Sequence, residues 1–150
     1  MSHLSCFNYK GFGEAKCKEL WYSQAIRVGD RIECAGQGGW DPETQVVKKD
    51  ISDEIDQAFS NVDLALKTAG GKGWCQVYKI NVYTTVMNEE AIGALVRNLQ
   101  TWLPDHQPIM TAVGVNALGL EGMRVEIEVA AHDPEGAAKL ASEKAKEVAK

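Results

Sequence analysis

The spacing of hydrophobic residues changes along the chain from a period of two to a helical period and back. β-Branched and aromatic residues are dense over residues 77–84 (VYKINVYT), and residues 109–115 and 123–130 have the same character, which is typical of strands. Two shorter apolar segments, 20–28 and 31–36, flank Gly29-Asp30. A two-residue link of this kind closes a hairpin, so five strands are predicted.

Two segments between these strands have the apolar stripe of an amphipathic helix. The first stripe runs through Ile51, Ile55, Ala58, Phe59, Val62, Leu66 and Ala69. Gly70-Gly71 follows it and is expected to end the helix in a left-handed cap. The second stripe consists of Ile92, Leu95, Val96, Leu99 and Trp102, after Asn88 as the N-cap and before Pro104. The predicted order is therefore β-β-α-β-α-β-β.

This order predicts an α+β fold with a mixed sheet and two helices on one of its faces. A strand–helix–strand crossover implies parallel pairing, whereas the hairpins imply antiparallel pairing. The strands VYKINVYT and IMTAVGV are nevertheless apolar at both parities. The face without helices must also be shielded from water, so we expect the protein to associate with itself.

The chain divides into an N-terminal segment (1–19), a domain (20–132) and a C-terminal helical tail (133–150). Asp133-Pro134 resembles an N-cap followed by the first helical residue, and the tail is rich in good helix formers. Its acidic and basic residues balance and its large apolar residues are few. We expect a solvated or loosely docked helix rather than a partner-binding or membrane-surface helix.

Charge and composition exclude several functional classes. The 150 residues have a formal net charge of −5, which disfavours nucleic-acid binding because phosphate neutralisation needs a basic patch. No apolar run is long enough to span a bilayer, and the N-terminal sequence lacks the apolar region of a signal peptide. These observations favour a cytoplasmic protein without membrane association.

Cysteines and histidines do not form a recognisable metal or nucleophile motif. The four cysteines, Cys6, Cys17, Cys34 and Cys75, contain no CxxC pair, so we expect reduced thiols packed as small core residues. The three histidines, His3, His106 and His132, are expected at the surface. We also expect Asp53, Glu54 and Asp56 to lie on a solvated helix face rather than to bind a metal.

Two other segments could carry chemistry. The glycine-rich run 36–39 follows a strand but precedes Trp40-Asp41-Pro42 instead of a helix, so it lacks the helix N-terminus of a phosphate site. Glu126 and Glu128 in VEIEV fall on one face of the last strand. A partly buried carboxylate there suits proton transfer or water activation. The alternative is an ion pair with Arg124 or with a lysine of a neighbouring subunit.

The ordered motifs of residues 20–131 resemble the RidA (YjgF) family, also described as L-PSP endoribonuclease-like. The resemblance rests on YSQAIRVGDRIECAGQGGWDPETQ, a helix that ends in AGG, VYKINVYTTVMN, PIMTAVGVNAL and VEIEVAA. It implies a chorismate-mutase-like α+β fold, a homotrimer, and three clefts between subunits that bind a small molecule. The implied activity is hydrolysis of reactive 2-imino or 2-enamino acids to 2-keto acids and ammonia, without a metal or an organic cofactor.

One position departs from the family's pattern. The arginine that grips the substrate carboxylate lies two residues after the proline that opens the penultimate strand, and Met110 takes that place after Pro108. The neighbouring Ser-Cys pair of many members corresponds to Thr111 and Ala112, and a cleft-lining asparagine corresponds to Ala94.

Other family positions are retained. The resemblance assigns Tyr22 as the site tyrosine, Gly36 as the glycine whose backbone lines the cleft, and Glu126 as the carboxylate that positions water. Trp40 is expected to add a bulky apolar wall to the cleft. Arg97 is either a substitute cation or an ordinary surface arginine.

Two functions follow from these residues, and a third is disfavoured. The first is a deaminase-type hydrolase whose substrate choice is altered by Met110, with Glu126 and Tyr22 as catalytic residues. The second is a non-catalytic trimer that binds a small ligand in the same clefts. An endoribonuclease is the third, and the net charge of −5 counts against it.

Overall fold

The computed structural model describes residues 2–149; Met1 and Lys150, at the ends of the predicted N-terminal segment and tail, lie outside the described residues. The strands are β1 (Ser5–Phe7), β2 (Ala25–Val28), β3 (Arg31–Cys34), β4 (Gln37–Gly38), β5 (Val77–Thr84), β6 (Ile109–Gly114) and β7 (Val125–His132). The helices are α1 (Phe12–Leu20), α2 (Ile51–Thr68), α3 (Glu89–Trp102) and α4 (Pro134–Val148), with one 3₁₀ turn at Trp74–Gln76.

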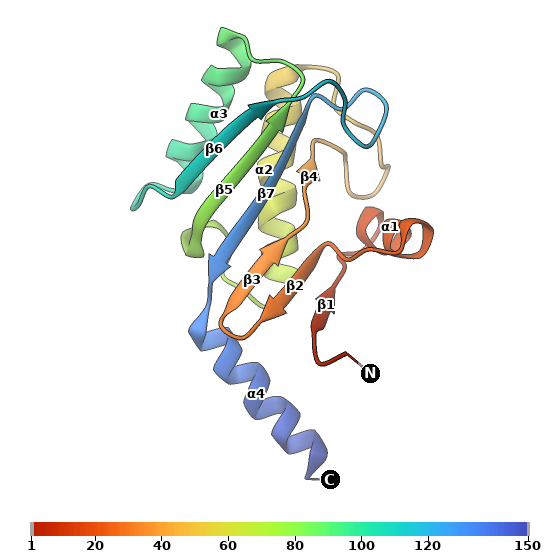
Figure 1. Cartoon of the computed structure of the whole chain (residues 1–150), viewed down its shortest axis with the longest axis vertical. Coiled ribbons are helices and arrows are strands. Elements are labelled where there is room, and N and C mark those ends of the chain that lie inside the picture. The colour runs from red at the N-terminus through yellow and green to blue at the C-terminus, as the bar shows by residue number, and fades with distance from the viewer. Residues whose placement is uncertain (1, 150) are drawn as a thin grey trace.

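The strands form one mixed sheet, as predicted. Its order is β1-β2-β3-β7-β5-β6, and the short strand β4 pairs with β7 beyond the end of β3. Strands β5 and β6, which α3 connects, are parallel, whereas the other pairs are antiparallel. Strand β7 is therefore central, and β6 is an edge strand (Figure 1).

Helices α2 and α3 pack on the same face of the sheet, as predicted (Figure 1). The alternating residues Val125, Ile127 and Val129 of β7 are buried in the core with the apolar stripe of α2. Glu126 and Glu128 alternate with them and therefore lie on the opposite face, here called the outer face. The caps also agree with expectation: Asn88 caps α3, and Gly70 has φ 84° just after α2.

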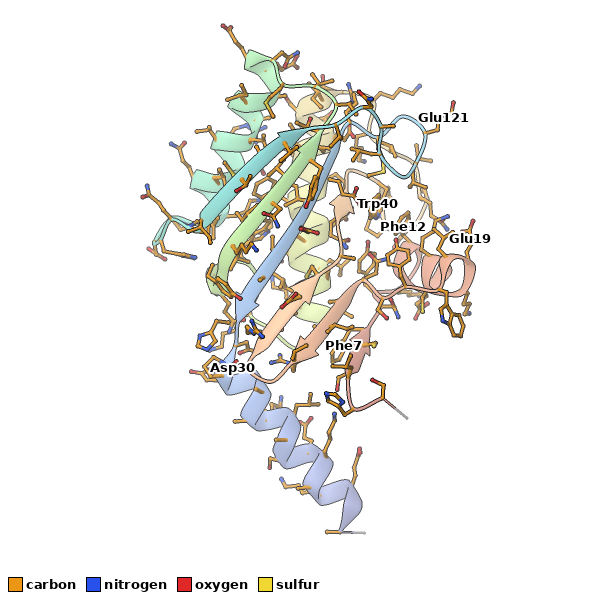
Figure 2. The ribbon with its side chains drawn as sticks, viewed as in Figure 1. Phe7, Phe12, Glu19, Asp30, Trp40 and Glu121 are labelled. Carbon is orange, nitrogen blue, oxygen red and sulfur yellow. The ribbon has the colours of Figure 1, made fainter. Side chains whose placement is uncertain are left out.

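The N-terminal segment contains two elements that the sequence analysis did not predict. It forms β1 and α1, and Leu20 is the last residue of α1 rather than the first of a strand. Phe12 is buried and its ring stacks on Trp40 with centroids 3.9 Å apart (Figure 2). Helix α1 begins after Gly11 without a side-chain cap, so the usual sequence signal for a helix start is missing.

The C-terminal tail forms α4, which leads away from the sheet and is largely exposed (Figure 1). Asp133 caps this helix by accepting a hydrogen bond from the Gly136 amide. The same carboxylate forms a buried ion pair with Arg27 at 2.7 Å, which fixes the base of the helix. Further along the helix, Lys144 Nζ donates a hydrogen bond to Ser5 Oγ at 2.8 Å. No helix within residues 2–149 is long and apolar enough to cross a membrane.

The burial of two cysteines and of one histidine differs from the prediction. Cys34 is buried, but Cys6 and Cys75 are exposed, so the prediction of core thiols is wrong for these two. They lie on a short edge strand and in a single 3₁₀ turn, elements with little buried surface. His106 is partly buried rather than exposed, and its Nε2 lies 2.6 Å from the Val77 carbonyl oxygen.

The prediction that Glu54 faces solvent is also wrong. Its side chain is 0% exposed, and one carboxylate oxygen accepts hydrogen bonds from the amides of Arg124 and Val125 at 2.6 and 3.3 Å. The other oxygen accepts from Arg124 Nε at 2.7 Å. Glu54 therefore ties the first turns of α2 to the start of β7, and these donors replace the water that the carboxylate gives up.

We predict that Glu54→Gln lowers the free energy of unfolding by about 2–3 kcal/mol, because Arg124 and two buried amides lose their charged acceptor. Urea denaturation measures the loss. The control is Asp63→Asn, which breaks the more exposed Asp63–Lys67 pair of the same helix and is expected to cost under about 0.5 kcal/mol. Equal losses for the two variants would contradict the role assigned to Glu54.

Candidate functional site

The outer face of the sheet carries two carboxylates on its central strand. Glu128 Oε1 accepts hydrogen bonds from Asn81 Nδ2 at 2.7 Å and from Tyr83 Oη at 3.0 Å. Both donors come from β5, which pairs with β7 in antiparallel register. The structure therefore confirms that Glu126 and Glu128 share a face, and it supplies two partners that the strand pattern alone did not reveal.

Glu126 is half-buried. Burial raises the pKa of its carboxyl above the usual range, and the neighbouring Glu128 carboxylate raises it further. Within residues 2–149 no side chain or amide donates a hydrogen bond to it. The carboxyl group is consequently available to a ligand and is a stronger base than an ordinary surface glutamate.

Gly36 lies directly against Glu126. A Cβ atom built on Gly36 would be 2.3 Å from Glu126 Oε1, so the backbone reaches the carboxylate because this position has no side chain. Tyr22 lines a nearby surface cavity together with Trp21, Glu33 and Ala35, the residue before Gly36. The structure thus brings Gly36 against Glu126 and places Tyr22 beside the residue that precedes Gly36, and among the described residues no hydrogen bond joins Tyr22 to Glu126.

A buried polar network fixes these segments from inside. Tyr9 Oη donates to Gln37 Oε1 at 2.8 Å, and Gln37 Nε2 donates to Gln24 Oε1 at 2.9 Å. Gln24 follows Tyr22 by two residues, and Gln37 follows Gly36. Burial raises the pKa of Tyr9, which keeps its hydroxyl a hydrogen-bond donor. The sequence analysis missed these residues because an isolated glutamine or tyrosine carries no signal that its side chain is buried with a partner.

Trp40 is buried and is hydrogen-bonded to this network. Its side chain is 1% exposed, its indole Nε1 donates to Tyr9 Oη at 3.0 Å, and its ring stacks on Phe12 (Figure 2). The structure therefore places Trp40 behind the site, in the core, and not as a wall open to a ligand. Helix α1, which the sequence did not predict, is what covers it.

Met110 lies away from the carboxylates. It pairs with the buried Ile80 in the parallel β5–β6 register, so Met110 and Ala112 point toward the helix layer. Thr111 pairs with Asn81 and points toward the outer face. One chain therefore separates Met110 and Ala112 from Glu126, on opposite faces of the sheet.

A cavity of about 720 Å³ adjoins Met110, between β6 and α3. Apolar side chains dominate its wall, among them Val96, Leu99 and Leu103. Polar groups come from Gln100, Asp105, His106 and Gln107, and no lysine or arginine lines it. The cavity thus lacks a cation for a carboxylate at the place where the family's pattern puts an arginine.

Arg97 does not replace that arginine in the structure. Its guanidinium forms an ion pair with Asp56 at 2.8 Å, which bridges α3 and α2. The pair is exposed and belongs to the helix layer, and Arg97 does not line the cavity beside Met110. Ala94, one turn earlier on α3, is buried. The interpretation of Arg97 as a surface arginine fits this placement.

Edge strand β6 presents an apolar surface to the solvent. All six of its residues are exposed although most are apolar, and Ile109 is 67% exposed. An apolar edge strand with free backbone groups is a surface that another chain can cover. No cluster of His, Cys, Asp or Glu suited to a metal ion occurs among the described residues.

Comparison with known proteins shows which family the chain belongs to. The family model described as Endoribonuclease L-PSP matches residues 16–133, which end where α4 begins. The mouse protein named 2-iminobutanoate/2-iminopropanoate deaminase is 36% identical over 111 residues, which cover 73% of this chain and 79% of that protein. A RutC family protein of Pyrococcus horikoshii is 34% identical over 112 residues and covers 74% and 86% of the two chains.

Solved structures agree. The crystal structure of RidA from an Antarctic Psychrobacter has 30% identity and a TM-score of 0.67, and the match covers 85% of this chain and 93% of that one. The structure titled Protein YJGH has 26% identity and a TM-score of 0.75 and covers 89% and 99%. The fold is the chorismate-mutase-like fold of these proteins, and the chain belongs to the RidA (YjgF) family, the family described as Endoribonuclease L-PSP.

Proposed function

We propose that this protein is an imine or enamine hydrolase of the deaminase type whose substrate lacks the carboxylate of a 2-imino acid. The proposal rests on one observation: the carboxyl suited to proton transfer and the cavity suited to substrate binding differ in charge and lie at different places in the structure. A half-buried carboxyl with a raised pKa, Glu126, faces the open outer surface. The cavity beside Met110 offers mostly apolar contacts and no lysine or arginine. Relatives named as deaminases of 2-iminobutanoate and 2-iminopropanoate support the reaction class.

The chemistry requires water, a base and an acid. Glu126 removes a proton from water as the oxygen bonds to the imine carbon, and the C=N bond becomes a single bond. The same carboxyl gives that proton to the nitrogen, which yields a carbinolamine. It then moves the hydroxyl proton of the carbinolamine to the nitrogen, the C–N bond breaks as the C=O bond forms, and ammonia leaves with a carbonyl product. Tyr22 and the Gly36 backbone are assigned to orienting the substrate beside Glu126. This sequence of steps calls on no redox partner.

Met110 determines which imine is accepted. A charge-assisted pair between an arginine and a carboxylate contributes about 1.5–3 kcal/mol, which corresponds to about a 10- to 150-fold difference in affinity. A thioether provides no such donor. A carboxylate that entered the cavity beside Met110 would lose its water without an ionic partner, so a neutral apolar substituent is favoured there.

The site is completed by self-association into a homotrimer. One chain separates Met110 from Glu126, on opposite faces of the sheet, and the exposed apolar strand β6 is suited to pack against another copy. In the trimer, β6 of one subunit closes the cleft over Glu126 of the next. Ala112, which shares a face with Met110, then lines the cleft with it, and Thr111 borders the cleft from the outer face of the same strand.

A second function, a non-catalytic trimer that binds a small ligand in the same clefts, is favoured by the absence of a cation beside Met110. It predicts that a carboxylate-free imine or its carbonyl product raises the melting temperature without being turned over. A ribonuclease has less support, because the net charge is −5 and the outer face carries paired carboxylates.

The first test measures ammonia release from 2-aminoacrylate generated in situ. We expect the wild-type protein to be nearly inactive and Met110→Arg to gain at least about tenfold, because the substituted guanidinium supplies the carboxylate partner. Met110→Gln is the control, since it adds polarity without charge and should not gain. A wild type as fast as Met110→Arg would show that another cation binds the carboxylate and that our assignment of Met110 is wrong.

The second test uses a neutral imine, such as benzylimine formed from benzylamine by a flavin amine oxidase. We expect the wild type to hasten benzaldehyde formation, and Glu126→Gln to abolish the gain because an amide cannot accept the proton of water. Thermal unfolding shows whether the variant is folded. Equal rates for the two folded proteins would contradict the hydrolase and leave the ligand-binding trimer.

A further inference from the structure

Three side chains beside Glu126 form a cluster that the proposed chemistry does not yet use. Asn81 and Tyr83 of β5 both donate hydrogen bonds to one oxygen of Glu128 on β7, at 2.7 and 3.0 Å. In the antiparallel register Asn81 lies opposite Glu128, whereas Tyr83 lies opposite Glu126. Tyr83 therefore reaches diagonally, with its backbone position beside Glu126 and its hydroxyl on Glu128.

Two donors restrict the movement of the Glu128 carboxylate. An exposed glutamate ordinarily samples several rotamers. Water screens its charge, so its electrostatic effect on a neighbouring group is small. Here the Asn81 amide and the Tyr83 hydroxyl both donate hydrogen bonds to Glu128 Oε1. The carboxylate is thereby held on the outer face beside Glu126 instead of turning into solvent.

The held carboxylate is close enough to influence Glu126. Same-face side chains two residues apart on a strand are separated by about 7 Å, which is shorter than the Debye length of about 8 Å at physiological ionic strength. Glu126 is also half-buried, so salt screens the interaction less than it would at an exposed site. A like charge at this distance disfavours loss of the Glu126 proton.

We propose that Glu128 is a positioning residue for proton transfer: Asn81 and Tyr83 fix its carboxylate beside Glu126, and this fixed negative charge makes Glu126 a stronger base toward water. The inference rests on the proposed role of Glu126 and deepens it. Glu128 does not touch the substrate. It acts through Glu126, and Tyr83 and Asn81 act through Glu128.

The other groups on this face do not substitute for Glu128. Glu33 and Lys79 line a small cavity with Asn81 and Glu128, and their opposite charges offset each other. Tyr83 donates to Glu128, and that contact raises the pKa of its phenol, so the ring stays neutral. Cys34 borders the same cavity, but its side chain lies with Ile32 in the core, where burial raises the pKa of the thiol to about 12. From β6 the same face receives Thr111 and Val113, and from β4 it receives Gly38.

Carboxyl NMR of the intact protein with ¹³C-labelled glutamate tests the proposal without any substrate. We expect Glu128→Gln to lower the pKa of Glu126 by about 0.5 to 1, since the like charge is gone. Tyr83→Phe keeps the ring beside Glu126 but removes one donor from Glu128, so it should lower the pKa of Glu126 by a smaller amount. Glu121→Gln removes one exposed charge from a loop and is the control, with no change expected.

Each result is decisive. An unchanged pKa of Glu126 in Glu128→Gln would overturn the proposal, whatever the enzyme does. A fall in Glu128→Gln with no change in Tyr83→Phe would overturn the part assigned to the two donors. On the neutral imine, the acidic limb of the rate profile should move to lower pH in Glu128→Gln, because it reports deprotonation of Glu126. Inactivity of all the proteins would count against the proposed function while the NMR result still stands.

Discussion

The alternation of residues along β7 is the constraint on which the rest of the structure depends. Val125, Ile127 and Val129 face the apolar stripe of α2, so Glu126 and Glu128 must face away from it. Strand β7 pairs with β3 and β4 on one side and with β5 on the other. A slip of one residue would bury two carboxylates and expose three core side chains, so its register is strongly determined. The chemistry of the outer face is thus set by the packing of the inner face.

The ends of the helices and turns maintain that register. Glu54 holds the first residues of β7 against α2 through the Arg124 side chain and two backbone amides. The buried Tyr9–Gln37–Gln24 network holds the strand-to-strand loop so that Gly36 meets Glu126. Both arrangements use buried polar groups that have hydrogen-bond partners. Such hydrogen bonds are strong in the protein interior and restrict the side chains to one arrangement. They explain how a two-residue strand and a glycine-rich loop can present a site reproducibly.

The same sheet geometry leaves the site divided within one chain. The parallel pairing of β6 with β5 directs Met110 toward the helices, whereas Glu126 faces outward. Met110 lies on an exposed, apolar edge strand, and β5 separates that strand from β7. Burial of that edge against a second copy would satisfy its backbone groups and would join an apolar recognition surface to a proton-transfer group. In the function we propose, self-association and substrate choice would both depend on this one strand.

Much of the fold could be predicted from the sequence, because α2, α3 and the long strands have a regular hydrophobic period and clear caps. Helix α1 has a weaker pattern and no capping side chain, so it was missed, and with it the burial of Trp40. Glu54 was misplaced because a helical charge pattern does not show which turn meets a backbone donor.

Part of the candidate site could also be predicted from the sequence. Strand alternation put Glu126 and Glu128 on one face, and the family motif identified Tyr22, Gly36 and Met110 as positions to examine. The hydrogen bonds from Asn81 and Tyr83 depend on the register between strands that are distant in the chain, and single-strand patterns do not contain that register. The placement of Met110 and Glu126 on opposite faces has the same origin.

The most direct test of this account is the crystal structure of the protein in its solution assembly, whose mass should be three times that of the 16.4 kDa chain. We predict that β6 of one subunit packs against the next, so that Met110 of the first and Glu126 of the second line one cleft. An assembly in which β6 stays exposed to solvent, or a monomer in solution, would contradict the claim that substrate choice and proton transfer meet at an interface between copies.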